Sequence, residues 1–261
     1  THPCRGQQDR IQMPVARALR QNVTSKKSAA MTPAPAAVAK NIRTATVAAE
    51  AKEINMKHII KDIELAAAGE QKIQWAWRHM PVLNQIAAEF EQTRPFAGLR
   101  IAVSIHVEAK TACLARTLAA GGAEVSLTAC NPLSTQDDVA AALAAGGMKV
   151  YCIYGASAEE YESHLKAALA IKPDLIIDDG GDLAALLHTQ YQDLAANIRG
   201  ACEETTTGIH RLRLLAEAGQ LRYPVLSVND ARCKHLFDNR YGTGQSVFTA
   251  IMSTTNLIIA G

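Results

Sequence analysis

The stretch from Val228 to Ser246 concentrates charged and amide side chains directly after an apolar, strand-like run. Lys234 and Asp238 are four residues apart, so on a helix they would lie on one face and reach the same ligand. Asn229 lies on the segment that leads into this helix. The combination predicts a ligand-binding site. For Lys234 and Asp238 alone, an exposed helix pair worth a few tenths of a kcal/mol is the alternative.

Three further motifs combine acidic, hydroxyl and small residues. They are residues 131–137 (NPLSTQD), 177–183 (IDDGGDL) and 203–208 (EETTTG). Taken singly, each has a structural explanation: the threonines would cap a helix, and the DDGGD run would be a turn with glycines at positive φ. His106, at the end of a strand-like run, would likewise be a structural histidine. Only the joint presence of these motifs favours a functional site.

Strand-like and helix-like runs alternate from Ile60 onward and would position these motifs. Apolar residues at helical spacing predict one amphipathic helix over residues 73–93. Strands are predicted at residues 99–107, 124–129, 149–154, 175–178 and 225–228, and helices at residues 110–120, 135–145, 158–171, 183–191 and 206–218. This alternation predicts an α/β fold with a doubly wound, mostly parallel, Rossmann-like sheet. Ligands bind such sheets at the carboxyl ends of the strands, where His106 and the motifs fall.

Composition excludes several classes of protein. The 261 residues are 48% hydrophobic and 20% charged, which is enough for a soluble domain with a core. The longest apolar runs are far shorter than the roughly 20 residues of a membrane helix. Six cysteines are scattered without CxxC spacing, and no HExxH or HxxxH occurs, so we expect reduced thiols, a cytoplasmic location and no metal site.

Charge divides the chain into two parts. Residues 1–57 carry ten Lys or Arg against three acids, while the remainder carries 17 against 22. The first part is also rich in Ala, Ser and Pro, so we expect a flexible tail that does not belong to the folded domain. It could be an organellar transit peptide, or upstream sequence preceding a start at Met31 or Met56. The mildly acidic remainder, residues 58–261, argues against a nucleic-acid partner.

The four motifs, in this order, closely resemble S-adenosyl-L-homocysteine hydrolase (adenosylhomocysteinase) from about Ile63 to Gly261. The resemblance implies reversible hydrolysis of S-adenosylhomocysteine to adenosine and homocysteine. In that family, tightly held NAD transiently oxidises the ribose 3′-hydroxyl, which acidifies the C4′ proton and permits elimination of homocysteine and addition of water. It also implies a homotetramer.

Residue roles follow from the resemblance. Glu204 and Asp238 match residues that hold the ribose hydroxyls, and Lys234 matches the base beside the 3′-hydroxyl, with Asn229 positioning it. His106 and Asp137 match the pair that transfers protons at C5′. The positions that match contacts to NAD are Thr205, Thr206, Thr207 and Asn239.

Residues 106–111 (HVEAKT) depart from the common family pattern HxTxE/QT and match a minority group from archaea and thermophilic bacteria. Glu108, Lys110 and Thr111 match positions that face the purine. The departure leaves adenine and hypoxanthine open, so S-inosylhomocysteine is a possible substrate. The alternative is that Glu108 and Lys110 merely open a helix, since glutamate is favourable in a first turn.

The resemblance also implies a second, NAD-binding domain after the helix that matches residues 245–257. No GxGxxG fingerprint occurs in this sequence, so residues 58–261 are interpreted as the substrate-binding and catalytic domain of a longer enzyme, inactive in isolation. The rival interpretation is a truncated, non-catalytic paralogue that binds a nucleoside or regulates full-length subunits. Retention of Asp137, Glu204, Lys234 and Asp238 favours the enzyme.

Overall fold

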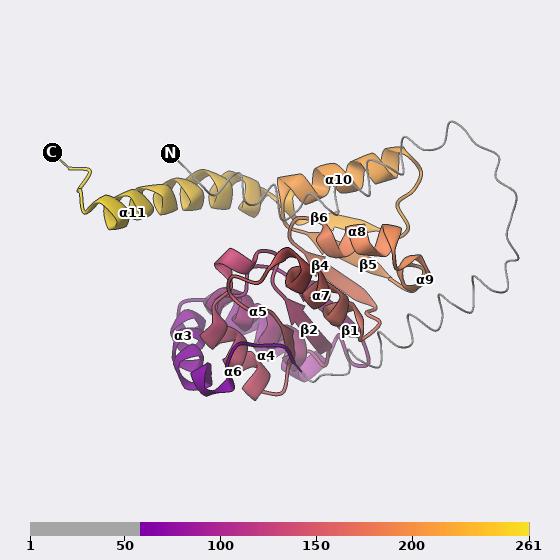
Figure 1. Ribbon diagram of the computed structural model, residues 1–261, viewed down its shortest axis with the longest axis horizontal. Helices are drawn as coiled ribbons and strands as arrows, with labels where there is room; N and C mark the ends of the chain where they lie inside the picture. Colours follow the sequence, from indigo (N-terminus) through magenta and orange to yellow (C-terminus); the bar gives the residue numbers. More distant parts are fainter. Residues whose placement is uncertain (1–57, 261) are drawn as a thin grey trace, which may run out of the picture.

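A single six-stranded parallel sheet organises the molecule. The computed structural model describes residues 58–260, so the expectations about residues 1–57 lie outside the described part of the chain. The strand order is β3-β2-β1-β4-β5-β6 (Figure 1). This is the order of doubly wound nucleotide-binding folds, and the predicted fold class is confirmed. The strands are β1 (Arg100–Ser104), β2 (Glu124–Thr128), β3 (Lys149–Tyr151), β4 (Leu175–Asp178), β5 (Gly200–Glu203) and β6 (Val225–Ser227).

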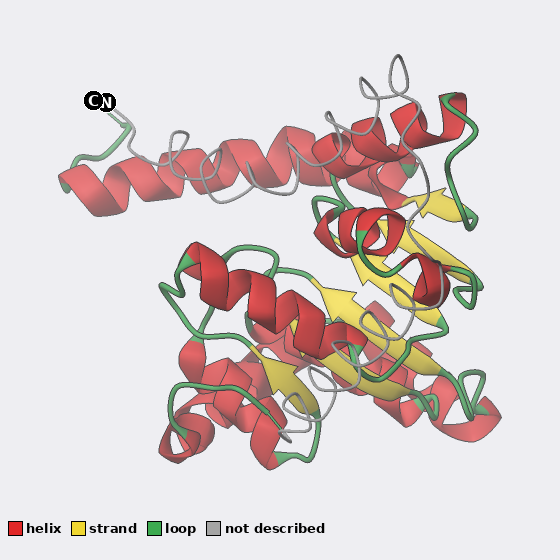
Figure 2. Cartoon of the chain, turned by 45° about the vertical axis from the view of Figure 1, so that its right-hand side comes forward, coloured by secondary structure: helices red, strands yellow, loops and turns green. Residues whose placement is uncertain are grey.

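Helices cover both faces of the sheet (Figure 2). Ile101 and Val103 of β1 pack into one apolar cluster with residues of α3 (Ala66–Arg78), α5 (Ala109–Ala120) and α6 (Asp137–Ala145). Ala102, which points the opposite way, packs into a second cluster with residues of α7 (Ala158–Leu169) and α8 (Asp182–Thr189). The central strands are therefore buried on both faces, which explains their continuous apolar runs. The helix α10 (Thr206–Glu217) and the short α9 (Gln192–Ala195) complete the layers.

The prediction of one helix over residues 73–93 is wrong. After the short turn η1 (Ile63–Leu65), the chain forms α3 and then α4 (Pro81–Thr93), with a break at His79 and Met80. Pro81 is the first residue of α4, because proline has no N–H for the helical ladder and its ring would clash with the preceding turn. The apolar spacing continued across the break, which hid it from a periodicity argument.

The strand β5 was not predicted either. Its sequence, GACE, begins with glycine and contains no β-branched residue, so it lacks the composition typical of strands. It forms because it lies between β4 and β6 and shares its hydrogen bonds with both. Tertiary context decides the conformation here.

The last part of the described chain leaves the body of the molecule. After η3 (Val228–Asp230), the π-helical η4 (Lys234–Gly242) runs into α11 (Thr243–Thr255), which extends away from the sheet (Figure 1). No residue of η4 or α11 is buried.

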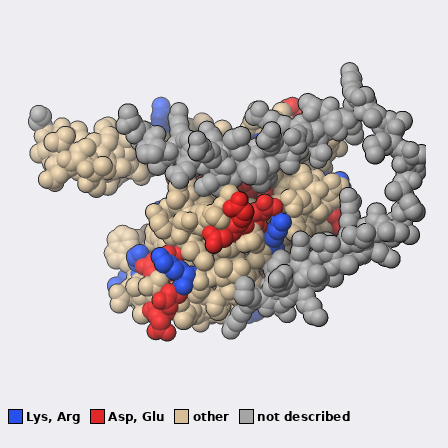
Figure 3. All heavy atoms as spheres, in the orientation of Figure 1, with Lys and Arg blue, Asp and Glu red and all other residues tan. Residues whose placement is uncertain are grey.

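The surface charge and the lengths of the apolar helices agree with what the composition predicted. On the face drawn in Figure 3, acidic and basic side chains of the described residues lie next to one another and form no continuous basic area. No helix between residues 58 and 260 combines the length and apolar character needed to cross a membrane.

Candidate active site

Five neighbouring strands each deliver a polar side chain to the same edge of the sheet. Across the sheet, the segments after β2, β1, β4, β5 and β6 carry Cys130, His106, Asp179, Glu204 and Asn229. The carboxyl ends of parallel strands lie at one edge, so residues far apart in sequence meet there. His106 and Asp179 flank the junction between β1 and β4, where the chain reverses the direction in which it adds strands.

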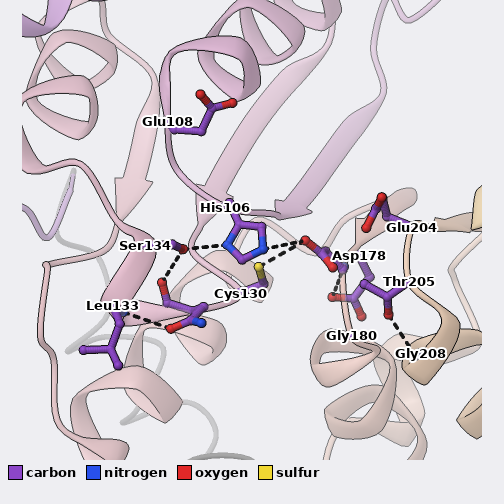
Figure 4. Close-up of polar contacts among 12 residues, drawn as sticks. His106, Glu108, Cys130, Leu133, Ser134, Asp178, Gly180, Glu204, Thr205 and Gly208 are labelled. Atoms are coloured by element: carbon purple, nitrogen blue, oxygen red, sulfur yellow. Dashed lines mark hydrogen bonds and ion pairs between the residues drawn. The ribbon is translucent and has the colours of Figure 1, made fainter. Parts of the chain in front are cut away.

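His106 is held between two polar groups (Figure 4). Its Nδ1 lies 2.5 Å from the Ser134 hydroxyl, and its Nε2 lies 3.4 Å from Oδ2 of Asp179. Ser134 belongs to the turn η2 (Pro132–Ser134), which Asn131 caps by accepting from the Leu133 amide at 2.9 Å. The imidazole is therefore oriented at both nitrogens, as a proton-transfer group requires.

The expected pairing of His106 with Asp137 is not the one that the structure makes. Asp137 is the first residue of α6, and its carboxylate accepts from the Tyr154 amide at 2.8 Å and pairs with Lys61 at 3.2 Å. Asp179 is the carboxylate beside His106 instead. The starting turn of α6 points Asp137 toward the loop after β3, whereas the end of β4 directs Asp179 toward the neighbouring β1.

A second set of contacts joins Glu204, Lys234 and Asn229. The Lys234 ammonium lies 3.2 Å from the Glu204 carboxylate and donates to Asn229 Oδ1 at 3.1 Å. The same oxygen accepts from the Thr206 hydroxyl at 3.2 Å. Asp179 also raises the pKa of the Glu204 carboxyl, so the two carboxyl groups interact electrostatically between His106 and Lys234. The 3.1 Å hydrogen bond confirms that Lys234 and Asn229 meet, while their roles stay predictions.

Electrostatics at this edge favour protonated acids. Burial raises the pKa of the Glu204 carboxyl, Asp179 raises it further, and Lys234 opposes the shift. Behind it, the fully buried Asp178 and Glu203 also have raised pKa values, chiefly because burial penalises their charged forms. Glu203 accepts from the amides of Gly180 and Thr205 at 2.8 and 2.9 Å and so ties the loops after β4 and β5 together.

The glycines after Asp179 form the turn that the sequence predicted. Gly180 and Gly181 have φ values of 112° and 76°, a region that glycine adopts without steric cost. The turn leads directly into α8, whose Asp182 accepts from Tyr161 at 2.9 Å and pairs with Arg211 at 3.0 Å. This network fixes the loop that presents Asp179.

Asp238 and Asn239 are not brought into the site. Both are exposed on η4, and neither side chain makes a hydrogen bond or ion pair within residues 58–260. Lys234, at the start of η4, contacts Glu204 and Asn229, whereas Asp238, four residues later, contacts neither of them. The prediction that Lys234 and Asp238 meet the same ligand stays a prediction.

The three threonines have different environments. Thr205 caps α10 by accepting from the Gly208 amide at 2.9 Å, as the capping alternative predicts, and it donates to Glu203 at 3.0 Å. Thr206 is engaged by Asn229. Thr207 is exposed and has no partner among the described residues, which leaves its hydroxyl available to a ligand.

Glu108 opens a helix. Its carboxylate caps α5 by accepting from the amides of Lys110 and Thr111 at 3.2 and 3.3 Å. The Lys110 ammonium is 3.9 Å from the same carboxylate, and its side chain is 70% exposed. Figure 4 shows Glu108 apart from the contacts of His106. The helix-opening explanation is therefore confirmed for Glu108, and Lys110 remains free to reach a ligand.

Sequence reasoning missed three residues of this edge: Asp179, Cys130 and Ser134. Asp179 lies in the DDGGD motif and Ser134 in the NPLSTQD motif, so both motifs were recognised, but other members were chosen than the two that contact His106. Cys130 immediately precedes the second motif and donates to Asp179 at 3.3 Å. The doubly wound fold class was the usable signal, since its usual strand order places the ends of β1 and β4 side by side.

Comparison with known proteins identifies the family. A model of S-adenosyl-L-homocysteine hydrolase matches residues 57–192 and 188–261. The chain belongs to the S-adenosyl-L-homocysteine hydrolase family. Its sequence is 57% identical over 202 residues to an S-inosyl-L-homocysteine hydrolase of Methanocaldococcus jannaschii, covering 77% of this chain and 49% of that protein. It is 56% identical over 204 residues to an adenosylhomocysteinase of Pyrococcus abyssi, covering 78% of this chain and 48% of that protein.

An S-inosyl-L-homocysteine hydrolase of Methanothermobacter thermautotrophicus is 52% identical over 206 residues, covering 79% of this chain and 49% of that protein. The chain thus spans about half the length of the curated relatives it matches. The names of these relatives divide between two purines.

Proposed function

We propose that this chain carries the substrate-binding and acid–base groups of an enzyme that hydrolyses the thioether of a purine nucleoside linked to homocysteine. The observation that carries the proposal is the pair of contacts at one sheet edge, His106 with Asp179 and Lys234 with Glu204, whose two carboxyl groups interact electrostatically. Family membership supports the reaction class. The site supplies two proton-transfer groups, an imidazole and an amine, joined by two carboxyl groups.

The ribose end of the proposed site is Glu204 and Lys234. A carboxylate that accepts from a ribose hydroxyl and an amine that removes its proton would together activate the 3′-position. Asn229 orients Lys234 through a 3.1 Å hydrogen bond and is itself buried. Burial and Asp179 raise the pKa of Glu204, whereas its pairing with Lys234 opposes the shift.

The thioether end of the proposed site is His106 and Asp179. The imidazole would donate a proton to the leaving sulfur and later accept one from water, with Asp179 stabilising its charged form. Ser134 fixes the ring from the other side. In this assignment Asp179 takes the role that the family resemblance implied for Asp137, while Asp137 anchors the loop after β3.

The residues fit a cofactor only in part. Thr207 and Asn239 are exposed and without partners among the described residues, so they can donate to or accept from NAD, whereas Thr205 and Thr206 are already engaged. NAD, when bound, would accept a hydride from the ribose 3′-carbon. We propose that the chain contributes one wall of that site, within a homo-oligomeric enzyme.

We further propose that the site prefers hypoxanthine to adenine. Lys110 has an exposed, flexible ammonium that can donate a hydrogen bond to the 6-oxygen of hypoxanthine. The exocyclic 6-amine of adenine cannot accept such a bond. Relatives named as S-inosyl-L-homocysteine hydrolases, at 57% identity, support this choice. Sites built around one substrate hydrogen bond discriminate strongly against analogues that lack it.

The direct test joins this chain to the part of the Methanocaldococcus jannaschii relative that it does not match. We expect hydrolysis of both S-inosyl- and S-adenosylhomocysteine, with a higher kcat/KM for the former. Lys234→Met should slow single-turnover reduction of NAD by about 10²-fold or more, the scale for removing a positioned base. Wild-type rates in that variant would contradict the assignment of Lys234.

The purine assignment has a separate test in the same chimera. Glu108→Thr with Lys110→Glu retains an oxygen that can cap α5 and removes the donor. The ratio of the two kcat/KM values should shift toward the adenosyl substrate by about ten-fold, while the rate of the chemical step changes less. An unchanged ratio would leave Glu108 and Lys110 with a role in the helix alone.

A further inference from the structure

Three side chains of metal-binding type converge at the edge of the sheet. His106, Cys130 and Asp179 follow β1, β2 and β4, and one ligand atom from each lies within 4.8 Å of the other two. Asp179 Oδ2 is common to both contacts, 3.3 Å from Cys130 Sγ and 3.4 Å from His106 Nε2 (Figure 4). The three residues lie on separate segments, so spacing patterns such as CxxC or HxxxH do not detect them.

The hydrogen bonds around His106 determine which nitrogen faces Asp179 with a lone pair. The Ser134 hydroxyl donates its single hydrogen to the Asn131 carbonyl at 3.0 Å. With the hydroxyl hydrogen placed there, Ser134 accepts from His106 Nδ1–H, and the neutral ring then has its lone pair on Nε2. Metal-binding histidines show the same arrangement, in which the remote N–H is fixed by a hydrogen bond.

A positive charge is needed where these atoms meet. A lone pair on Nε2 and a carboxylate oxygen at 3.4 Å repel each other unless a cation or a second ring proton lies between them. Cys130 Sγ and Asp179 are buried, whereas the His106 side chain is 47% exposed and gives access from solvent. The position is thus enclosed on two sides and open on one.

Two of the three ligand separations match those around a tetrahedral ion, and the third is within 4.8 Å. With ligand distances of about 2.0 to 2.3 Å to nitrogen, oxygen and sulfur, a tetrahedral zinc ion separates its ligand atoms by about 3.4 to 3.6 Å. The two contacts to Asp179 Oδ2, at 3.4 and 3.3 Å, are close to these values without any movement of the backbone. A thiolate, an imidazole and a carboxylate together select a borderline-soft divalent cation over magnesium or calcium.

We propose that His106, Cys130 and Asp179 bind one thiophilic divalent cation, represented by Zn²⁺, with the fourth position open to water. The ion would occupy Nε2, the atom assigned above to proton transfer, and would exclude substrate from that end of the site. This inhibitory consequence rests on the proposed function. Binding of the ion does not, because it depends only on the three ligands.

The test uses the 261-residue chain with Cys4→Ser and Cys233→Ser as background, which removes two competing thiols, the exposed Cys233 and Cys4 of the undescribed residues 1–57. Co²⁺ is the spectroscopic probe, and calorimetry follows Zn²⁺. We expect one equivalent of metal per chain and a thiolate-to-cobalt charge-transfer band. Absence of that band, or no saturable binding of Zn²⁺, would overturn the proposal.

Matched cysteine variants locate the ion. Cys130→Ser should abolish the band and weaken Zn²⁺ binding at least ten-fold, whereas Cys113→Ser, which changes a buried thiol of α5 that faces α3, should alter neither. If Cys130→Ser does not fold by circular dichroism, His106→Gln provides the same comparison at a half-exposed position. Binding that persists at the original affinity in a folded Cys130→Ser or His106→Gln protein would refute the site. No substrate is present, so the result is independent of the hydrolase assignment.

Discussion

His106 and Asp238 were both predicted as site residues, but their surroundings in the structure are opposite. His106 follows a strand that is buried on both faces, and it is fixed at both ring nitrogens. Asp238 lies on a segment, residues 234–255, in which no residue is buried, and its side chain has no partner among residues 58–260. Contacts within the fold hold the side chains at the sheet edge in place, whereas most side chains of the C-terminal segment have no such contacts.

Lys234 marks the boundary between the two regions. It is the first residue of the C-terminal segment, yet its ammonium reaches back to Glu204 and Asn229 at the sheet edge. Four residues later the chain has lost contact with the sheet. Proximity in sequence to a positioned residue therefore does not position a side chain; packing of its own element does.

The largest expected difference between the regions is in stability. A Cβ at Gly69 would lie 1.9 Å from the Asp138 carbonyl oxygen, so Gly69→Ala forces α3 away from α6. We expect a loss of about 2 kcal/mol in the free energy of unfolding, measured by urea denaturation, because overpacking outweighs the better helix propensity of alanine. Unchanged stability would mean that α3 and α6 are not packed as the structure has them.

The features that could be predicted from the sequence are those that depend on burial. Alternating apolar runs predicted the parallel sheet, and the carboxyl-end rule located the site, because both depend on burial, which leaves a pattern in the sequence. Gly180 and Gly181 were likewise readable, since positive φ selects glycine. Two features were missed. The strand β5 depends on tertiary contacts with β4 and β6, and the helix break depends on a single residue, Pro81, within a continuing apolar pattern.

The side chain beside His106 is Asp179 and not Asp137, and this difference has a definite physical cause. Motif matching identifies a segment, but it does not say which way each of its carboxylates points. Asp178 and Asp179 are adjacent, yet one accepts from the Ala184 amide inside the fold and the other faces His106. That alternation at a strand end, with the neighbouring strand known, is what decides between Asp137 and Asp179.

The next prediction compares ligand binding by Lys234 and Asp238 in this chain. Lys234→Met should weaken binding of inosine by about ten-fold, since it removes a charged hydrogen-bond donor and leaves Glu204 without its partner. Asp238→Asn should change the dissociation constant by less than about two-fold, because nothing within residues 58–260 holds that side chain. Isothermal titration gives both values. Equal losses would show that the C-terminal segment closes on the nucleoside.

A smaller effect should appear in the pH dependence of stability. Burial raises the pKa of Glu203 above its usual 4.5, so the folded chain holds this proton more tightly than the unfolded chain. Its contribution to stability is complete below pH 4.5 and is lost as pH rises through the folded pKa. Glu203→Gln should therefore flatten the change in unfolding free energy between pH 5 and pH 8, by about 1.4 kcal/mol for each unit of the shift.

Asp238→Asn is the control for that measurement, since it removes the same formal charge from an exposed position. Urea titrations at several pH values should give this variant the wild-type slope against pH. A wild-type slope in Glu203→Gln as well would mean that the buried carboxyl pair of Asp178 and Glu203 is not what couples stability to protons.

The smallest expected effect is at Gly244, the counterpart of Gly69 in the C-terminal segment. A Cβ at Gly244 meets nothing within 4 Å, and the residue lies inside α11, so alanine adds helix propensity without a clash. The gain should be about 0.5 to 1 kcal/mol within the helix itself. Since no residue of α11 is buried, this gain should raise amide-exchange protection there and leave the urea midpoint of the sheet domain unchanged. A raised midpoint would show that α11 unfolds together with the sheet, and the distinction between a positioned edge and a free helix would fail.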